Sequence, residues 1–445
     1  MKKIGIVGAG LAGSLQAILM AKKGYDVSVF ERRTDLRKAK LIAGRSINLA
    51  LSHRGWKALE LAGIADDIHE IAIPMYKRCM HALDGTLTHQ AYGKEDEAIY
   101  SVSRGGLNQK LMNLADQYPS ISYYFNRKCT DIDLDTNTLL FDNSETKEKE
   151  KHKLDKVFAT DGAFSAVRMR MQKSTLFDYS QKYLDHGYKE LVIPANEDGS
   201  HKLDKNCLHI WPRGEFMMIA LGNLDGSFTC TLFFPMKGEV SFESLTTPEL
   251  ITAFFNKTFP DAVAMMPNLM TDYMENPTSS LIMVRCTPWN YKEDVVLIGD
   301  AAHAIVPFYG QGMNCAFEDC TVFHEMHEEV GGNWDGLLDR FSEKRVPEGN
   351  AILDLALQNY IEMRDLTADP EFLLQKKIEA KFSKLYPEKW TPMYSQVTFS
   401  HTPYSQALRN GKLQDEIMAN ILKMENIHEN WDDSSVMDKL LSLVK

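Results

Sequence analysis

The N-terminal stretch of the chain has the hydrophobic pattern of a strand, a helix and a second strand. Lys3 to Val7 is a short apolar run, Ser14 to Lys23 carries apolar residues at helical spacing, and Tyr25 to Glu31 alternates apolar and polar positions. A strand, helix and strand in this order form a right-handed unit with parallel strands. The pattern therefore predicts that a buried parallel sheet begins at the N-terminus.

Two later stretches repeat a buried strand followed by a turn. Lys156 to Ala159 precedes the turn Asp161-Gly162, and Asp294 to Ile298 precedes the turn Gly299-Asp300. The plainer interpretation of this Asp-Gly pair, together with Ser165, is a helix N-cap. A helix is predicted after the second turn, over residues 315–330.

The middle and the end of the chain differ in character. Between the two turns, the alternating stretches indicate antiparallel strands, whereas the last quarter indicates helices. The predicted strands are His209 to Pro212, Phe216 to Leu221 and Ser227 to Phe234, and the predicted helices are Pro347 to Arg364, Pro370 to Tyr386 and a region after Thr402.

Composition excludes several classes of protein. The chain has 445 residues with 44% hydrophobic content, 50 Lys and Arg against 61 Asp and Glu, and a formal net charge of −11. Such a charge disfavours nucleic acid and anionic membrane surfaces as partners. The seven cysteines show no Cys-x-x-Cys spacing, so we expect reduced thiols, no metal site and a cytoplasmic location. Monomer and homodimer both remain open.

The glycines of the first turn have the spacing of a dinucleotide-binding loop. Gly8 permits a sharp bend, Gly10 lets backbone amides approach a pyrophosphate, and Gly13 allows the helix to pack on the strand. Glu31, at the end of the second strand, can accept hydrogen bonds from ribose hydroxyls and disfavours a 2′-phosphate. FAD or NAD is thus expected rather than NADP, and the alternative is a purely structural turn.

The second turn predicts a further cofactor contact. Asp300 stands at the carboxyl end of a strand, where it can bind a polyol hydroxyl, and Gly310 and Gly312 allow backbone amides to approach a flat ring. His303 follows closely, but a single histidine with no second ligand at helical spacing is expected to be a structural hydrogen-bonding residue.

With these three motifs in order, the sequence resembles the FAD-dependent aromatic hydroxylases related to p-hydroxybenzoate hydroxylase. The motifs are the glycine loop with Glu31, Asp161-Gly162 and Gly299-Asp300. The resemblance implies bound FAD, with NADPH and O2 as co-substrates and no second dinucleotide domain. It also implies that a C4a-hydroperoxyflavin hydroxylates the aromatic ring, so that no side chain is assigned a certain catalytic role.

The resemblance implies a division of the chain. We expect an α/β fold with a discontinuous Rossmann-like FAD-binding domain, a β-sheet substrate domain and a C-terminal helical region. The predicted FAD-binding domain comprises residues 1–75, 95–178 and 279–345, the substrate domain residues 76–94 and 179–278, and the helical region residues 346–445.

Longer stretches are similar to the members of this family that act on L-kynurenine: Gly44 to Gly55, Ser101 to Arg104, Gly299 to Asn314 and Gln358 to Asp365. The resemblance implies that the carboxylate and amino group of such a substrate are held by Arg78, Tyr92, Asn359 and Tyr394. The FAD contacts that the motifs and the resemblance assign are Gly8, Gly10, Leu11, Gly13, Glu31, Arg32, Ala50, Arg104, Asp161, Asp300, Gly312, Met313 and Asn314.

Plainer interpretations exist for the substrate residues. Taken alone, Arg78 would form a surface salt bridge, Tyr92 and Tyr394 would be core tyrosines, and Asn359 would be a helix-surface amide. Other functions on the same fold are a hydroxylase of another aromatic substrate, a flavin-dependent reductase or halogenase, and a non-catalytic FAD-binding module. The Trp-x-Trp-x-Ile-Pro motif of halogenases is absent from the sequence.

Overall fold

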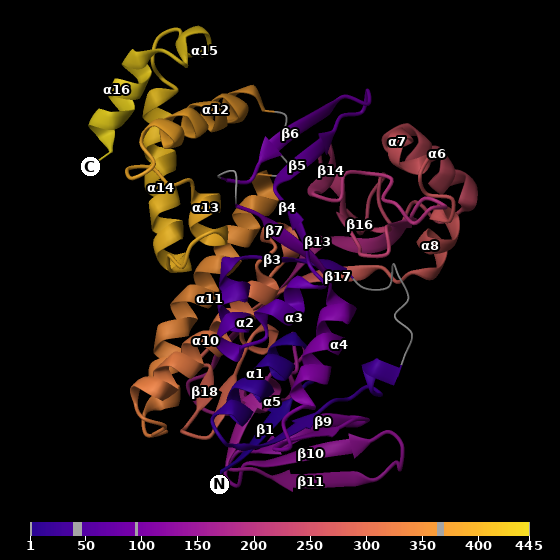
Figure 1. Cartoon of the computed structure of the whole chain (residues 1–445), viewed down its shortest axis with the longest axis vertical. Helices are drawn as coiled ribbons and strands as arrows, with labels where there is room; N and C mark the ends of the chain where they lie inside the picture. Colours follow the sequence, from indigo (N-terminus) through magenta and orange to yellow (C-terminus); the bar gives the residue numbers. More distant parts are fainter. Residues whose placement is uncertain (1, 39–46, 94–96, 363–368, 445) are drawn as a thin grey trace.

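The computed structural model describes residues 2–38, 47–93, 97–362 and 369–444. A six-stranded sheet in the order β18-β19-β12-β1-β2-β8 forms the half of the molecule around the N-terminus (Figure 1). Its strands are β1 (Lys3–Val7), β2 (Asp26–Phe30), β8 (Ile121–Tyr124), β12 (Lys156–Ala159), β18 (Asn290–Tyr291) and β19 (Val295–Leu297). All pairs except β18 with β19 are parallel, which confirms the predicted parallel sheet.

Helices cover this sheet and bury its apolar residues in the largest hydrophobic core of the molecule. Helix α1 packs against α4 and α10, and α10 packs against α2. These elements and the short helices around them are α1 (Leu11–Lys22), η1 (Leu36–Lys38), α2 (His53–Ala62), α3 (Ala65–His69), α4 (Arg104–Ala115), α5 (Ala166–Met171), α9 (Asp300–His303), η2 (Pro307–Tyr309) and α10 (Gly312–Glu329).

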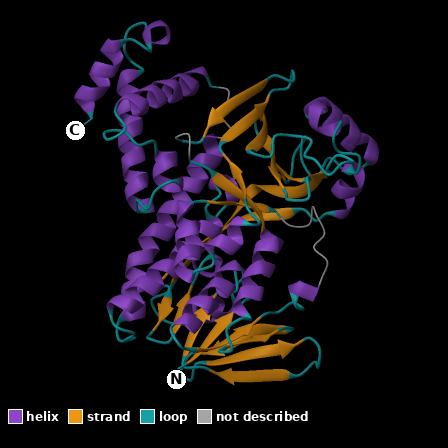
Figure 2. Cartoon of the chain, viewed as in Figure 1, coloured by secondary structure: helices purple, strands orange, loops and turns teal. Residues whose placement is uncertain are grey.

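Two small antiparallel sheets complete this half. One is a hairpin-based sheet of β9 (Arg127–Asp133), β10 (Thr138–Asn143) and β11 (Lys149–Lys153), at the edge nearest the N-terminus (Figure 2). The other comprises β3 (Asn48–Leu51), β7 (Ile99–Ser103) and β4 (Ile73–Met75). Through β3 and β7 it links the first half to the second.

A seven-stranded sheet in the order β17-β13-β16-β15-β14-β5-β6 forms the second half. Its strands are β5 (Lys77–His81), β6 (Leu87–Ala91), β13 (Asp178–Ile193), β14 (Cys207–Arg213), β15 (Phe216–Gly222), β16 (Phe228–Pro235) and β17 (Ser279–Thr287). The predicted antiparallel strands of this region are confirmed, because β14, β15 and β16 pair antiparallel in sequence order.

The two faces of the seven-stranded sheet have different partners. Leu232 and Phe234 of β16 pack with residues of α6 (Pro248–Thr258), α7 (Pro260–Val263) and α8 (Leu269–Glu275). Phe233, between them, points to the other face and packs with Phe308 and Tyr360. This alternation follows from the two-residue period of a strand. The second face is therefore turned toward the 300–310 loop and the C-terminal helices.

The first of the C-terminal helices begins beside α10 in the half around the N-terminus, and the last of them lie at the opposite end of the molecule (Figure 1). The C-terminal helices are α11 (Leu337–Ile361), α12 (Pro370–Leu385), α13 (Met393–Thr398), α14 (Tyr404–Ile421), α15 (Ile427–Asn430) and α16 (Ser434–Leu443). The helix that was expected to start at Pro347 starts at Leu337 instead, with Pro347 inside it. Leu337, Leu338 and Phe341 are fully buried in the large core, and this burial stabilises a helix that proline alone would interrupt.

The predicted division of the chain stays a prediction, and it differs from the observed sheets and helices at two places. Strand β17, assigned by the division to the FAD-binding domain, is the edge strand of the seven-stranded sheet. The boundary between residues 345 and 346 falls within α11. None of the helices in the described part of the chain is long and apolar enough to cross a membrane.

Candidate active site

The glycine loop between β1 and α1 is shaped by close backbone contacts. Gly8 has a φ of 99°, and a Cβ there would lie 2.7 Å from the Thr160 carbonyl oxygen. A Cβ on Gly13 would lie 2.0 Å from the Gly8 carbonyl oxygen, so only glycine fits at either position. A Cβ on Gly10, in contrast, would have no atom within 4 Å. The loop thus leaves open space at the N-terminus of α1, where an anionic phosphate is favoured.

Glu31 closes one side of this loop. It is 6% exposed, and its Oε2 accepts a hydrogen bond of 3.0 Å from the amide of Ala9. Its Oε1 accepts from the amide and the side chain of Arg33. Because each carboxylate oxygen has two lone pairs, Oε2 can still accept a hydrogen bond from one ribose hydroxyl. Leu11 is half-buried at the first position of α1 and Arg32 is exposed beside Glu31.

Asp161 combines a structural bond with an unsatisfied oxygen. Its Oδ2 accepts from the amide of Ala166 at 2.8 Å, while its Oδ1 is buried without a partner among the described residues. Burial raises the pKa of this carboxyl group. Ser165 caps α5 by accepting from the amide of Arg168, so the helix-cap interpretation is correct for Ser165. The free oxygen of Asp161 is suited to a ligand donor.

The loop after β19 is held by Asn314. This side chain is fully buried, accepts from the amide of Ser52 at 2.9 Å, and donates to the carbonyl oxygens of Ala50 and Gly310 at 2.8 and 2.9 Å. Its side-chain amide therefore ties β3 to the loop, so any FAD contact of Asn314 would use the backbone. A Cβ on Gly312 would again meet open space.

The remaining predicted FAD residues border the same region. Asp300 is exposed at the start of α9, Arg104 is exposed at the start of α4, and Met313 is buried in the large core. His303 is hydrogen-bonded in the buried interior, where its Nε2 lies 2.6 Å from Asp319 Oδ2, and its structural role stays a prediction. The open glycine cradle and the unsatisfied Asp161 oxygen fit a dinucleotide, and the individual FAD contacts stay predictions.

Arg168 is a buried residue that the sequence motifs do not assign to the site. It lies in α5 after the Asp161-Gly162 turn, and its Nη1 donates to the Ala301 carbonyl oxygen at 2.7 Å. The guanidinium group also donates to the Ala163 carbonyl oxygen. It thereby joins the two turns that are about 140 residues apart. The basic residue in the first turn of α5 is the only sequence signal for this link.

Three of the four predicted substrate residues meet on the second face of the seven-stranded sheet. The guanidinium carbon of Arg78 lies 5.0 Å from the ring centre of Tyr92 and 4.6 Å from that of Tyr394. The two tyrosine rings are stacked with centres 5.7 Å apart, and the ring of Tyr309 also stacks on that of Tyr394, with centres 5.5 Å apart. Arg78 comes from β5, Tyr92 follows β6, and Tyr394 lies on α13.

Arg78 does not form the surface salt bridge that it would make as an ordinary exposed arginine. Among the described residues, none of the carboxylates pairs with it. Tyr92 is 7% exposed, and its hydroxyl group is buried without a hydrogen-bond partner in the described part of the chain. Burial raises the pKa of Tyr92 and that of Tyr309, so both hydroxyl groups remain protonated donors. A cation and unused hydroxyl donors together suit a carboxylate.

Asn359 reaches this cluster through the loop. It lies on α11, and its Nδ2 donates to the Phe308 carbonyl oxygen at 2.7 Å, directly before Tyr309. The side chain is thus not a simple surface amide. Parts of two stretches used for the resemblance, Gly44 to Ser46 and Met363 to Asp365, lie outside the described residues.

Comparison with known proteins places the chain in a family. A family model described as an FAD binding domain matches residues 1–356. The chain is 52% identical to the kynurenine 3-monooxygenase of Flavobacterium johnsoniae over 443 residues, which cover 100% of this chain and 99% of the relative. It is 44% identical to that of Dictyostelium discoideum, covering 95% and 93% of the two chains. The chain belongs to the kynurenine 3-monooxygenase family. As a member of the kynurenine 3-monooxygenase family, it is a flavoprotein monooxygenase that binds FAD.

Solved structures agree with this fold. The structure of 2-methyl-3-hydroxypyridine-5-carboxylic acid oxygenase has a TM-score of 0.67 at 18% identity, with 83% of this chain and 94% of that chain covered. The structure of PqsL from Pseudomonas aeruginosa in complex with 2-aminobenzoylacetate has a TM-score of 0.65 at 16% identity, with 82% and 97% covered. These similarities confirm the predicted α/β fold.

Proposed function

We propose that this protein hydroxylates L-kynurenine to 3-hydroxykynurenine, with NADPH and O2 as co-substrates, in the catabolism of tryptophan. The names of its relatives support this substrate. The observation that carries the proposal is the position of Arg78, a cation stacked on two tyrosines with no carboxylate partner among the described residues. Such a cation favours a ligand that brings its own carboxylate.

The substrate amino acid group is held by the residues of this cluster. The planar guanidinium group of Arg78 binds the carboxylate through two parallel hydrogen bonds, and the Tyr92 and Tyr394 hydroxyl groups fix its position. Asn359 supports the loop that carries Tyr309 and offers its amide oxygen to the ammonium group. The aromatic ring of the substrate then extends along the sheet face lined by Phe233 and Phe308.

The cofactor would be held by the glycine loop, Glu31 and the two turns at Asp161 and Asp300. Bound FAD would supply electron transfer from NADPH and the activation of O2, which side chains cannot perform. The protein residues orient the substrate ring and keep water away, since Phe308 and Tyr309 are only 8% and 5% exposed. The aniline nitrogen of the substrate activates the ring, so no side chain needs to act as a general base.

A cytoplasmic location belongs to the proposal. It is supported by the seven cysteines, all of which are unpaired in the structure and six of which are buried, as expected in a reducing compartment.

The test is to measure NADPH consumption by the purified yellow protein with and without L-kynurenine and to determine the product mass. Stimulated consumption with a product one oxygen atom heavier is expected. Stimulation that produces only peroxide would indicate another aromatic substrate. Absence of stimulation would favour a reductase or a binding module on the same fold and would overturn the proposal.

A further inference from the structure

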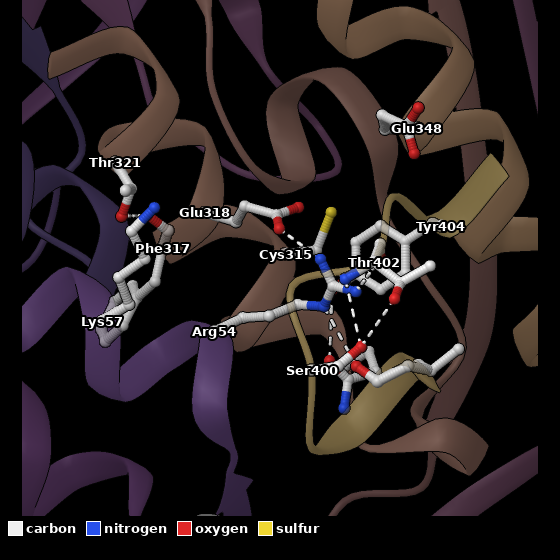
Figure 3. A network of polar contacts seen from close by, with 12 residues as sticks. Arg54, Lys57, Cys315, Phe317, Glu318, Thr321, Glu348, Ser400, Thr402 and Tyr404 are labelled. Carbon is white, nitrogen blue, oxygen red and sulfur yellow. Dashed lines mark hydrogen bonds and ion pairs between the residues drawn. The ribbon is translucent and has the colours of Figure 1, made fainter. Parts of the chain in front are cut away.

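Arg54 is a buried arginine that the proposed function leaves without a role. It is the second residue of α2, it belongs to one of the stretches that resemble the family, and it is 1% exposed. Its side chain points toward Glu318 on α10 and toward Thr402 and Tyr404 of the C-terminal region (Figure 3). A charge buried so deeply requires several partners, because removing it from water is costly.

The partners of Arg54 are mainly backbone carbonyl groups of one segment. Nε donates to the Val397 carbonyl oxygen at 3.0 Å, and Nη2 donates to those of Gln396 and Thr402. Gln396 and Val397 lie in the last turn of α13, and Thr402 lies in the connection to α14. The last carbonyl groups of a helix have no partner within the helix. Arg54 therefore satisfies the C-terminal end of α13.

Helix α13 depends on such external contacts. It comprises only the residues Met393–Thr398, and a helix this short is not stable by itself in water. Its N-cap residue Pro392 makes no side-chain capping hydrogen bond. The same helix carries Tyr394, whose ring contacts Arg78, Tyr92 and Tyr309.

The guanidinium group is itself held in a fixed orientation. Nη1 forms an ion pair with Glu318, and the ring of Tyr404 lies 3.9 Å from the guanidinium carbon. Glu318 also pairs with Arg345 at 2.8 Å. Burial alone would raise the pKa of Glu318, but Arg345 and Arg54 outweigh burial and hold it below its ordinary value. Glu318 lies on α10, the helix that begins in the predicted flavin loop at Gly312.

We propose that Arg54 is a positioning residue for substrate binding, which fixes α13 to the cofactor half so that Tyr394 stays stacked beside Arg78. This inference rests on the proposed function, because Tyr394 is assigned to the substrate there. Arg54 contacts neither the cofactor loop glycines nor the substrate cluster directly, and it acts through the backbone of α13. Lysine cannot replace it, since an ammonium group lacks the planar fork that reaches several carbonyl groups at once.

The test uses the holoenzyme with Arg54→Lys and, as a matched control, Lys57→Met. Lys57 lies on the same helix, one turn later, and pairs with Glu325 at 2.6 Å with both side chains about 40% exposed. Two quantities are measured: the amide hydrogen exchange of residues 393–403 without substrate, and the Kd of L-kynurenine from titration of the flavin absorbance. For Arg54→Lys we expect about tenfold faster exchange in this segment and a Kd about tenfold higher, with FAD retained. Lys57→Met should change neither.

A double variant tests whether Arg54 acts through Tyr394. If it does, Arg54→Lys should add little to the Kd of Tyr394→Phe, because coupled residues give non-additive effects. Independent, multiplying effects would overturn the proposal, and so would unchanged exchange of residues 393–403 in Arg54→Lys.

The failure of the two proposals can be told apart. If the wild-type protein does not bind L-kynurenine, the proposed function fails. The hydrogen exchange of residues 393–403 in Arg54→Lys still tests the role of Arg54: faster exchange supports it, and unchanged exchange contradicts it. If Arg54→Lys does not fold, Glu318→Gln replaces it, because it removes the ion pair that orients the guanidinium group. For Glu318→Gln we then expect about threefold faster exchange of residues 393–403 and a Kd about threefold higher. The absence of both changes would overturn the proposal.

Discussion

The cofactor side and the substrate side of the site are built in different ways. On the cofactor side, Gly8 and Gly13 are five residues apart and approach each other closely through backbone atoms. On the substrate side, Arg78, Tyr92 and Tyr394 come from three separate elements and meet only through side chains. The first site is fixed by local backbone conformation, and the second is fixed by tertiary packing. Variants on the cofactor side should therefore abolish folding or FAD binding altogether. Variants on the substrate side should raise the Kd of L-kynurenine in graded steps.

The largest effect is expected for Gly13→Val. Its Cβ would lie 2.0 Å from a carbonyl oxygen and 2.6 Å from Thr160 Oγ1, so we expect a destabilisation of about 4 kcal/mol or more and little folded protein. The matched variant is Gly10→Val, whose Cβ meets open space. It should lose FAD, as measured by flavin absorbance per protein, and fold with a Tm near that of the wild-type apoprotein, because bound FAD stabilises only the holoenzyme. Full FAD occupancy in Gly10→Val would show that the loop does not hold the pyrophosphate.

The next effect is expected for Arg78→Ala on the substrate side. Losing this cation should raise the Kd of L-kynurenine about a hundredfold, because a buried charge pair contributes about 2–5 kcal/mol when broken. Arg78→Lys keeps the charge but lacks the planar fork, so its Kd should lie between those of the wild-type protein and Arg78→Ala. FAD content should be unchanged in both. A variant that loses FAD would show instead that Arg78 is a structural residue.

This contrast explains which features the sequence predicted. The first strand, helix and strand, the glycine turn and the antiparallel strands were all predictable, because period and turn chemistry are local properties. The start of α11 at Leu337 was not, since burial of Leu337 and Phe341 in the large core outweighs the proline signal. The stacking of Tyr309 on Tyr394 and the reach of Arg54 across the interface depend on packing between distant segments. The sequence of α2 contains no pattern that predicts the contact of its second residue with α13.

A smaller effect is expected for Tyr92→Phe, which should weaken substrate binding without lowering stability. Its hydroxyl group is buried without a partner among the described residues, so removing it should leave the Tm unchanged or slightly higher while raising the Kd of L-kynurenine about fivefold. The control is Tyr273→Phe on the opposite face of the sheet, where another buried hydroxyl group has no partner in the described part of the chain. Tyr273→Phe should leave the Kd unchanged. Equal effects of the two variants on Kd would contradict a specific role for Tyr92.

The smallest effect concerns Glu190, at the boundary of the two sides. It lies on β13 near Arg104, its Oε2 is buried without a partner among the described residues, and burial raises its pKa to about 7. Because the folded state prefers the protonated form, the stability from this group is complete below pH 4.5 and is lost as the pH rises to about 7. Glu190→Gln should match the wild-type Tm at pH 4.5 and exceed it by about 2 °C at pH 8, as measured by calorimetry of the holoenzyme. The exposed control Glu197→Gln should give no such pH-dependent difference in Tm. If the Tm difference between Glu190→Gln and the wild type were the same at both pH values, the Glu190 carboxyl group would be hydrated rather than buried.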